Sequence, residues 1–116
     1  MYDKIHNYIY QRKDEIVNLL GEMVAIPSVK GDPIANAPFG KNCAKMLDFC
    51  EKLYKDNGFD TEMYQNDGYM LAHYGDGKEK IGLYAHGDVV PVGDDWLFTE
   101  PFKMIDRDGI RDRKQR

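Results

Sequence analysis

A short apolar run near the end of the chain does most to limit the folds open to it. Residues Ile81–Ala85 (IGLYA) contain no charged side chain and do not alternate between apolar and polar positions. Such a run suits a strand that is covered on both faces, as in the buried sheets of α/β proteins. We therefore expect residues 81–85 to form a buried strand and the chain to have an α/β fold.

Two segments before this run have the spacing of amphipathic helices. From Ile5 to Val24, apolar residues recur three and four positions apart, and Ile26-Pro27 ends the pattern because the residue before a proline is disfavoured in a helix. A second helix is predicted from about Asn42 to Asn57, with Gly58 supplying the left-handed residue that ends helices. Its apolar stripe consists of Cys43, Met46, Leu47, Cys50, Leu53 and Tyr54. Residues 27–40 hold three of the five prolines and predict an irregular loop.

A β-hairpin is predicted between the second helix and the apolar run. Phe59–Tyr64 alternates, residues 65–68 (QNDG) have turn chemistry, and Tyr69–Tyr74 follows as the partner strand. The expected architecture is therefore two helices, a hairpin and one buried strand.

Composition and charge limit the classes of function. A chain of 116 residues makes one domain at most, and its net charge of −4 argues against general nucleic-acid binding, which needs a basic face. No stretch approaches the roughly 18 apolar residues of a membrane span, and the N-terminus lacks the apolar segment of a signal peptide. We expect no nucleic-acid partner, no membrane and a cytoplasmic location.

The two cysteines agree with that location. Cys43 and Cys50 are seven residues apart on one predicted helix, which separates them by about 10.5 Å. This exceeds the Cα separation of about 7 Å at which a disulfide can form. Free thiols are typical of a reducing compartment.

The sharpest chemical feature is the sequence His86-Gly87-Asp88, directly after the predicted strand. Functional groups gather beyond the carboxyl ends of strands in α/β sheets. A histidine followed two residues later by an aspartate can form a metal ligand with a carboxylate that fixes its tautomer. An isolated His-x-Asp also fits a residue at a strand end followed by a turn. His6 and His73 are expected to be surface or half-buried histidines rather than ligands.

The surrounding residues favour the metal ligand. Residues 85–96 (AHGDVVPVGDDW), followed by Pro101-Phe102, resemble the first metal-binding signature of the di-zinc aminoacylase/dipeptidase family of metallopeptidases, which includes succinyl-diaminopimelate desuccinylases. Residues 26–29 (IPSV) are similar to a motif that follows the first helix in that family. Residues 37–40 (APFG) are similar to the peptidase V-like dipeptidases in particular. Trp96 and Phe102 are expected to pack the loop rather than contact substrate.

The resemblance implies a fold, a cofactor and residue roles. It implies that residues 1–105 are the N-terminal part of a zinc-peptidase catalytic domain, with His86 as the first zinc ligand. Asp88 matches the carboxylate that orients this histidine and is counted as catalytic. Two zinc ions in that family lower the pKa of a bridging water, which attacks the amide bond of a dipeptide or N-acyl amino acid.

The sequence departs from the family after Phe102. The family's Gly-Arg-Gly segment is missing, and its glutamate pair and later ligands have no counterpart. Residues 106–116 read as a charged, disordered tail, although Asp112 with Lys114 also fits a remnant of the family's Asp-x-Lys motif. We expect an incomplete domain, inactive alone, that binds zinc weakly. The alternatives are a non-catalytic remnant or partner-binding module, and a chain that completes a site with a separately encoded remainder.

A buried strand without the family's later strands and helices would leave apolar surface uncovered. An uncovered strand edge favours pairing with another chain, so self-association is also expected.

Overall fold

The computed structural model describes residues 1–107 and 110–112. The chain divides into two compact units, one made of Met1–Ala25 with Gly93–Arg116 and the other of Ile26–Val92. The apolar side chains that are buried among the described residues are Val24 in the first unit and Ala37 and Met46 in the second. None of the helices in this part of the chain is long and apolar enough to cross a membrane.

The first unit begins with two helices, where the sequence pattern predicted one. Helix α1 spans Tyr2–Gln11 and α2 spans Lys13–Ala25, with Arg12 between them at φ −100° and ψ 10°. The apolar spacing has a gap from Gln11 to Glu15, so no apolar contact supports a continuous helix across Arg12. The single predicted helix over residues 5–24 is therefore wrong in this detail.

The rest of the first unit is mostly irregular. Strands β3 (Ile105–Arg107) and β4 (Ile110–Asp112) pair as a short antiparallel hairpin. The remainder of the predicted charged tail, residues 108–109 and 113–116, lies outside the described residues.

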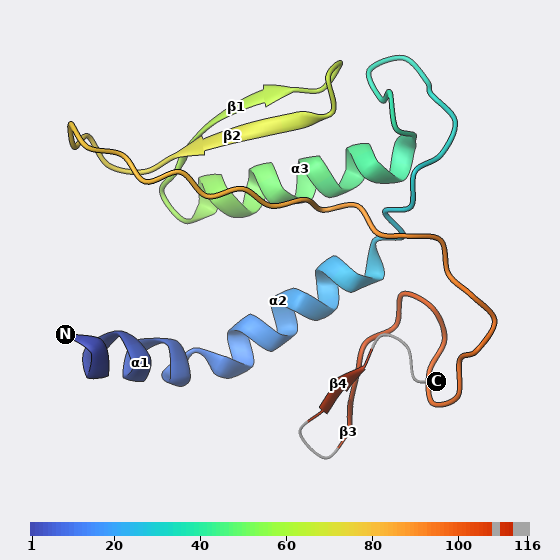
Figure 1. Cartoon of the computed structure of the whole chain (residues 1–116), viewed down its shortest axis with the longest axis horizontal. Helices are drawn as coiled ribbons and strands as arrows, with labels where there is room; N and C mark the ends of the chain where they lie inside the picture. The colour runs from blue at the N-terminus through green and yellow to red at the C-terminus, as the bar shows by residue number, and fades with distance from the viewer. Residues whose placement is uncertain (108–109, 113–116) are drawn as a thin grey trace. The chain divides into compact units, whose positions relative to one another are not determined.

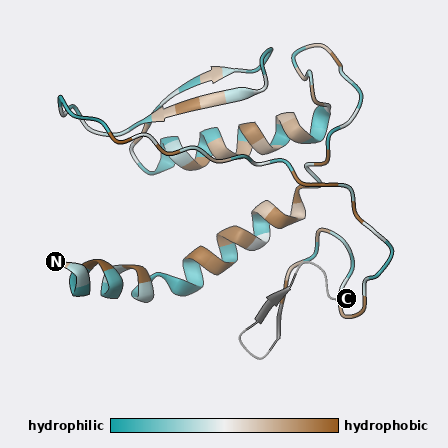
Figure 2. Ribbon diagram, in the orientation of Figure 1, coloured by the Kyte–Doolittle hydropathy of each residue, from teal (hydrophilic) through white to brown (hydrophobic). Residues whose placement is uncertain are grey.

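The second unit contains helix α3, which spans Lys41–Asp56 close to the predicted bounds. Apolar and polar residues alternate around its surface, as Figure 2 shows. The helix ends where the sequence indicated, because Gly58 has a φ of +84° and the Phe59 N–H donates to the Tyr54 carbonyl at 3.0 Å. The prediction of this helix is confirmed.

The predicted hairpin is also confirmed. Strands β1 (Asp60–Tyr64) and β2 (Tyr69–His73) form an antiparallel pair with Tyr64 opposite Tyr69 (Figure 1). Both strands contact α3, and every second residue of each strand is half-buried. Helices with a small sheet agree with the α/β prediction at this coarse level.

The predicted strand at Ile81–Ala85 is wrong. These residues form no strand, and the side chains of Ile81, Leu83 and Tyr84 are 93%, 97% and 96% exposed. An apolar run becomes a buried strand only when neighbouring strands take its backbone hydrogen bonds and other side chains cover both faces. No strand among the described residues pairs with this run.

Candidate functional site

The His86–Asp88 segment is held beside the loop that precedes α3. The Val89 N–H donates to the Ser28 carbonyl at 3.0 Å, and Val29 and Val89 form an isolated parallel bridge. The two stretches are about sixty residues apart in the sequence, and both belong to the unit Ile26–Val92. The backbone therefore brings together two of the motifs that the sequence singled out.

Ser28 adds a side-chain contact to this bridge. Its Oγ donates a hydrogen bond of 2.8 Å to the Gly87 carbonyl, and the residue is only 1% exposed. A buried hydroxyl needs such a partner, because an unsatisfied polar group in the interior is costly. Ser28 lies in the IPSV motif, and its place in the sequence did not predict this contact. A small polar residue directly after an apolar residue and a proline was the available signal.

Helix α3 packs against the other side of the same turn. A Cβ placed on Gly87 would lie 2.6 Å from Cγ of Met46, whose side chain is 5% exposed. Atoms do not approach this closely, so the position requires glycine unless Met46 moves. The turn is therefore fixed between the Ser28 loop and α3.

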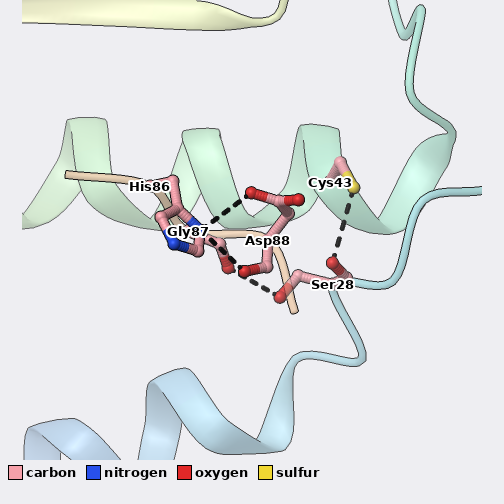
Figure 3. A network of polar contacts seen from close by, with 5 residues as sticks. All are labelled: Ser28, Cys43, His86, Gly87 and Asp88. Carbon is pink, nitrogen blue, oxygen red and sulfur yellow. Dashed lines mark hydrogen bonds and ion pairs between the residues drawn. The ribbon is translucent and has the colours of Figure 1, made fainter. Parts of the chain in front are cut away.

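The predicted ligand and its orienting carboxylate do meet. Nδ1 of His86 lies 3.0 Å from Oδ1 of Asp88 and 3.0 Å from the Asp88 carbonyl oxygen (Figure 3). Both partners are acceptors, so the Nδ1–H tautomer fits this geometry, and it leaves the lone pair of Nε2 for a metal. The side chains of His86 and Asp88 are 72% and 60% exposed, so the ring is accessible.

A cysteine lies at the edge of the same network. Sγ of Cys43 donates to the Ser28 carbonyl at 3.5 Å (Figure 3). Burial, and secondly the negative charge of Asp88, raise the pKa of the Cys43 thiol. The thiol is therefore protonated at neutral pH and acts as a weak donor here. Cys43 and Cys50 are both free, as predicted.

The other two histidines make contacts of their own. His73 pairs with Glu62 of the neighbouring strand at 3.4 Å, and His6 stacks on Tyr10 with ring centroids 6.4 Å apart. Both residues are exposed, as expected of surface histidines, and it stays a prediction that neither is a ligand. Trp96 donates from Nε1 to the Gly93 carbonyl at 2.9 Å, a contact within its own loop. Lys114 lies outside the described residues, as does the side chain of Asp112.

The donor atoms fit one position of a zinc site. His86 has a suitable ligand atom and a carboxylate that fixes its ring, as metal-binding histidines usually do. A catalytic zinc normally has three protein ligands. Within residues 1–107 and 110–112, no group of three His, Cys, Asp or Glu side chains could hold a metal ion. The described residues thus fit one ligand position with its supporting carboxylate, and they do not form a complete centre.

Sequence comparison places dipeptidases among the relatives of this chain. It is 36% identical over 103 residues to the Beta-Ala-Xaa dipeptidase of Lactobacillus delbrueckii subsp. lactis, a match that covers 84% of this chain and 21% of that protein. It is 33% identical over 99 residues to a protein of Staphylococcus aureus (strain USA300) named "Putative dipeptidase". This match also covers 84% of this chain and 21% of that protein. No family model matches the chain.

These similarities confirm the resemblance to dipeptidases that the motifs indicated. The chain spans about a fifth of the length of the curated relatives it matches.

Proposed function

Since most of this chain is homologous to dipeptidases, we propose that it contributes one part of a zinc-dependent, dipeptidase-like hydrolase that cleaves the amide bond of a dipeptide or N-acyl amino acid. The observation that carries the proposal is the contact between Nδ1 of His86 and Oδ1 of Asp88 at 3.0 Å, within a motif of metal-ligand spacing. The name of the Lactobacillus relative specifies a dipeptide as its substrate.

In this proposal His86 binds a metal through Nε2, and Asp88 is the residue that orients it. The carboxylate accepts the Nδ1–H, which selects the tautomer and raises the basicity of the ligand nitrogen. Zinc, when bound, would polarise the amide carbonyl and lower the pKa of a water molecule. The remaining ligands and the general base would come from outside the described residues, because no group of three His, Cys, Asp or Glu side chains among those residues could hold a metal ion.

The proposal includes inactivity of the 116-residue polypeptide by itself. General base catalysis contributes about 10²–10⁴ in rate, and a metal-bound hydroxide requires a formed site. Free cysteines and the motif content support a cytoplasmic enzyme, and the exposed side chains of Ile81–Tyr84 support self-association.

The test is reconstitution of activity. The chain is co-expressed with the part of the Lactobacillus dipeptidase that it does not match, and hydrolysis of a β-alanyl dipeptide is measured with added zinc or manganese. We expect activity above a metal-only blank from the combination and none from either part. His86→Ala and Asp88→Ala should abolish the restored activity, whereas His73→Ala should retain it. Activity of the 116-residue chain alone, lost in His86→Ala, would overturn the proposal that the site needs further ligands.

A further inference from the structure

Ser28, a buried residue next to the His86–Asp88 pair, makes hydrogen bonds through its hydroxyl and its carbonyl to the segment that carries the pair. Ser28 Oγ donates to the Gly87 carbonyl at 2.8 Å, and the Ser28 carbonyl accepts from the Val89 N–H at 3.0 Å. The Gly87 carbonyl belongs to the peptide group before Asp88, and the Val89 N–H belongs to the peptide group after it. Ser28 therefore holds both peptide groups that flank Asp88, as Figure 3 shows for the first of them.

The pair itself is too exposed to fix its own geometry. The side chains of His86 and Asp88 are 72% and 60% exposed, and exposed pairs are weak because water competes for both partners. Nδ1 of His86 contacts the carboxylate of Asp88 and also its backbone carbonyl, each at 3.0 Å. That carbonyl lies in the peptide group that Ser28 holds through Val89. The orientation of the imidazole thus depends on where the backbone places Asp88.

Two neighbours strengthen this placement. Met46 of α3 packs against Gly87 so closely that a Cβ on Gly87 would lie 2.6 Å from its Cγ. Cys43 donates to the same Ser28 carbonyl at 3.5 Å and adds a weak contact from the first turn of α3. Within the part of the chain that the structure describes, Ser28 is the residue whose side chain donates a hydrogen bond to the Gly87 carbonyl.

We propose that Ser28 is a positioning residue, which fixes the peptide groups around Asp88 so that the carboxylate holds His86 in the Nδ1–H tautomer. The inference deepens the proposed function and rests on the roles given there to His86 and Asp88. Ser28 does not touch the metal or the substrate in this account. The hydroxyl carries the part of this effect that is specific to serine, the hydrogen bond to the Gly87 carbonyl, and a single substitution removes it.

The experiment reads the tautomer of His86 directly in the 116-residue chain. The ¹⁵N shifts of the imidazole are measured at alkaline pH, on the neutral ring. In the unsubstituted chain we expect the Nδ1–H form to predominate. Loss of one hydrogen bond in Ser28→Ala should lower the ratio of Nδ1–H to Nε2–H by about fivefold, and Ser28→Thr, which keeps the hydroxyl, should restore it.

The control removes a comparable hydroxyl elsewhere in the same unit. Thr61 Oγ1 donates to Glu51 Oε1 at 3.3 Å, away from the pair. Thr61→Ala should leave the tautomer ratio of His86 unchanged. An equal change in Thr61→Ala would mean that the ratio reports general loosening of the fold, and it would overturn the proposal.

Two further outcomes are decisive. If Ser28→Ala unfolds the chain, Ser28→Cys replaces the hydroxyl by a weaker donor, and a ratio below that of the unsubstituted chain supports the proposal. An unchanged ratio in a folded Ser28→Ala or Ser28→Cys chain overturns it. The tautomer measurement uses no metal and no substrate, so its result is independent of the reconstitution experiment. The tautomer of His86 can respond to Ser28 even in a chain that restores no hydrolysis.

Discussion

Gly87 and Met46 approach so closely that a Cβ on Gly87 would lie 2.6 Å from Cγ of Met46. Gly87→Ala should therefore force a shift of α3 or of the His86–Asp88 turn. We expect the free energy of unfolding to fall by about 1–3 kcal/mol, as is usual when a packed contact is overfilled. Chemical denaturation monitored by circular dichroism measures this change.

The matched control is Gly82→Ala, since a Cβ at Gly82 meets nothing within 4 Å. That variant should stay within about 0.5 kcal/mol of the unsubstituted chain. In a Met46→Ala background the cost of Gly87→Ala should shrink, because the clashing side chain has been removed. Equal costs at Gly87 and Gly82 would contradict the packing described here.

The reactivity of Cys43 reports the position of Asp88. Burial first, and the charge of Asp88 second, raise the pKa of this thiol above its usual value of 9.0. Asp88→Asn removes the charge, lowers the pKa and so increases the thiolate fraction at pH 8. In a Cys50→Ser background, alkylation of Cys43 should accelerate by a factor of less than about ten. An unchanged rate would place the Asp88 carboxylate away from Cys43.

The raised pKa of Cys43 determines how the stability of the fold changes with pH. Because the pKa of Cys43 is higher in the folded chain, the protonated thiol contributes stability that is complete below the usual value of 9.0. This contribution is lost as the pH rises through the folded pKa. Cys43→Ser should flatten the alkaline part of the stability profile.

The exposed apolar run makes the chain prone to self-association. Leu83 is 97% exposed next to two other fully exposed apolar side chains, and such patches favour association. Leu83→Lys should lower the average mass measured by light scattering at high protein concentration. Leu97→Lys changes a leucine that is 69% exposed outside this run and should have a smaller effect. A sharp monomer peak from the unsubstituted chain would count against the prediction.

Local patterns account for the parts of the fold that were predicted. Helix α3 follows from its apolar stripe and from Gly58, and the β1–β2 hairpin follows from alternation around a turn with Gly68 at φ +75°. The strand expected at Ile81–Ala85 depended on partners elsewhere, and apolar composition alone could not supply them. The break at Arg12 reflects a gap in the apolar spacing, which the overall period of the segment concealed.

In the candidate site too, local sequence predicted some contacts and not others. His86 and Asp88 are two residues apart, so their contact was accessible from spacing and chemistry. The hydrogen bond from Ser28 to Gly87 joins residues 59 positions apart, and no local pattern specifies it. The resemblance to dipeptidases included both segments. The fold shows that Ser28 of the first segment supports the His86–Asp88 turn of the second.

Zinc binding by the 116-residue chain alone should be weak. A chelate requires several converging deprotonated groups, and the described residues contain no group of three His, Cys, Asp or Glu side chains that could hold a metal ion. Calorimetric titration should show an affinity no tighter than that of a surface histidine. Submicromolar binding that is lost in His86→Ala would contradict this prediction.

The central claim is that Asp88 orients His86 as a metal ligand, and zinc affinity of the reconstituted assembly tests it most directly. Loss of the partner that orients a ligand usually lowers metal affinity by about 10–100-fold, so we predict a loss of this size in Asp88→Asn measured by competition with a chelator. Asp76→Asn makes the same change of charge at an exposed residue of the same unit and should leave the affinity unchanged. Equal zinc affinity in Asp88→Asn and in the unsubstituted assembly would contradict the account.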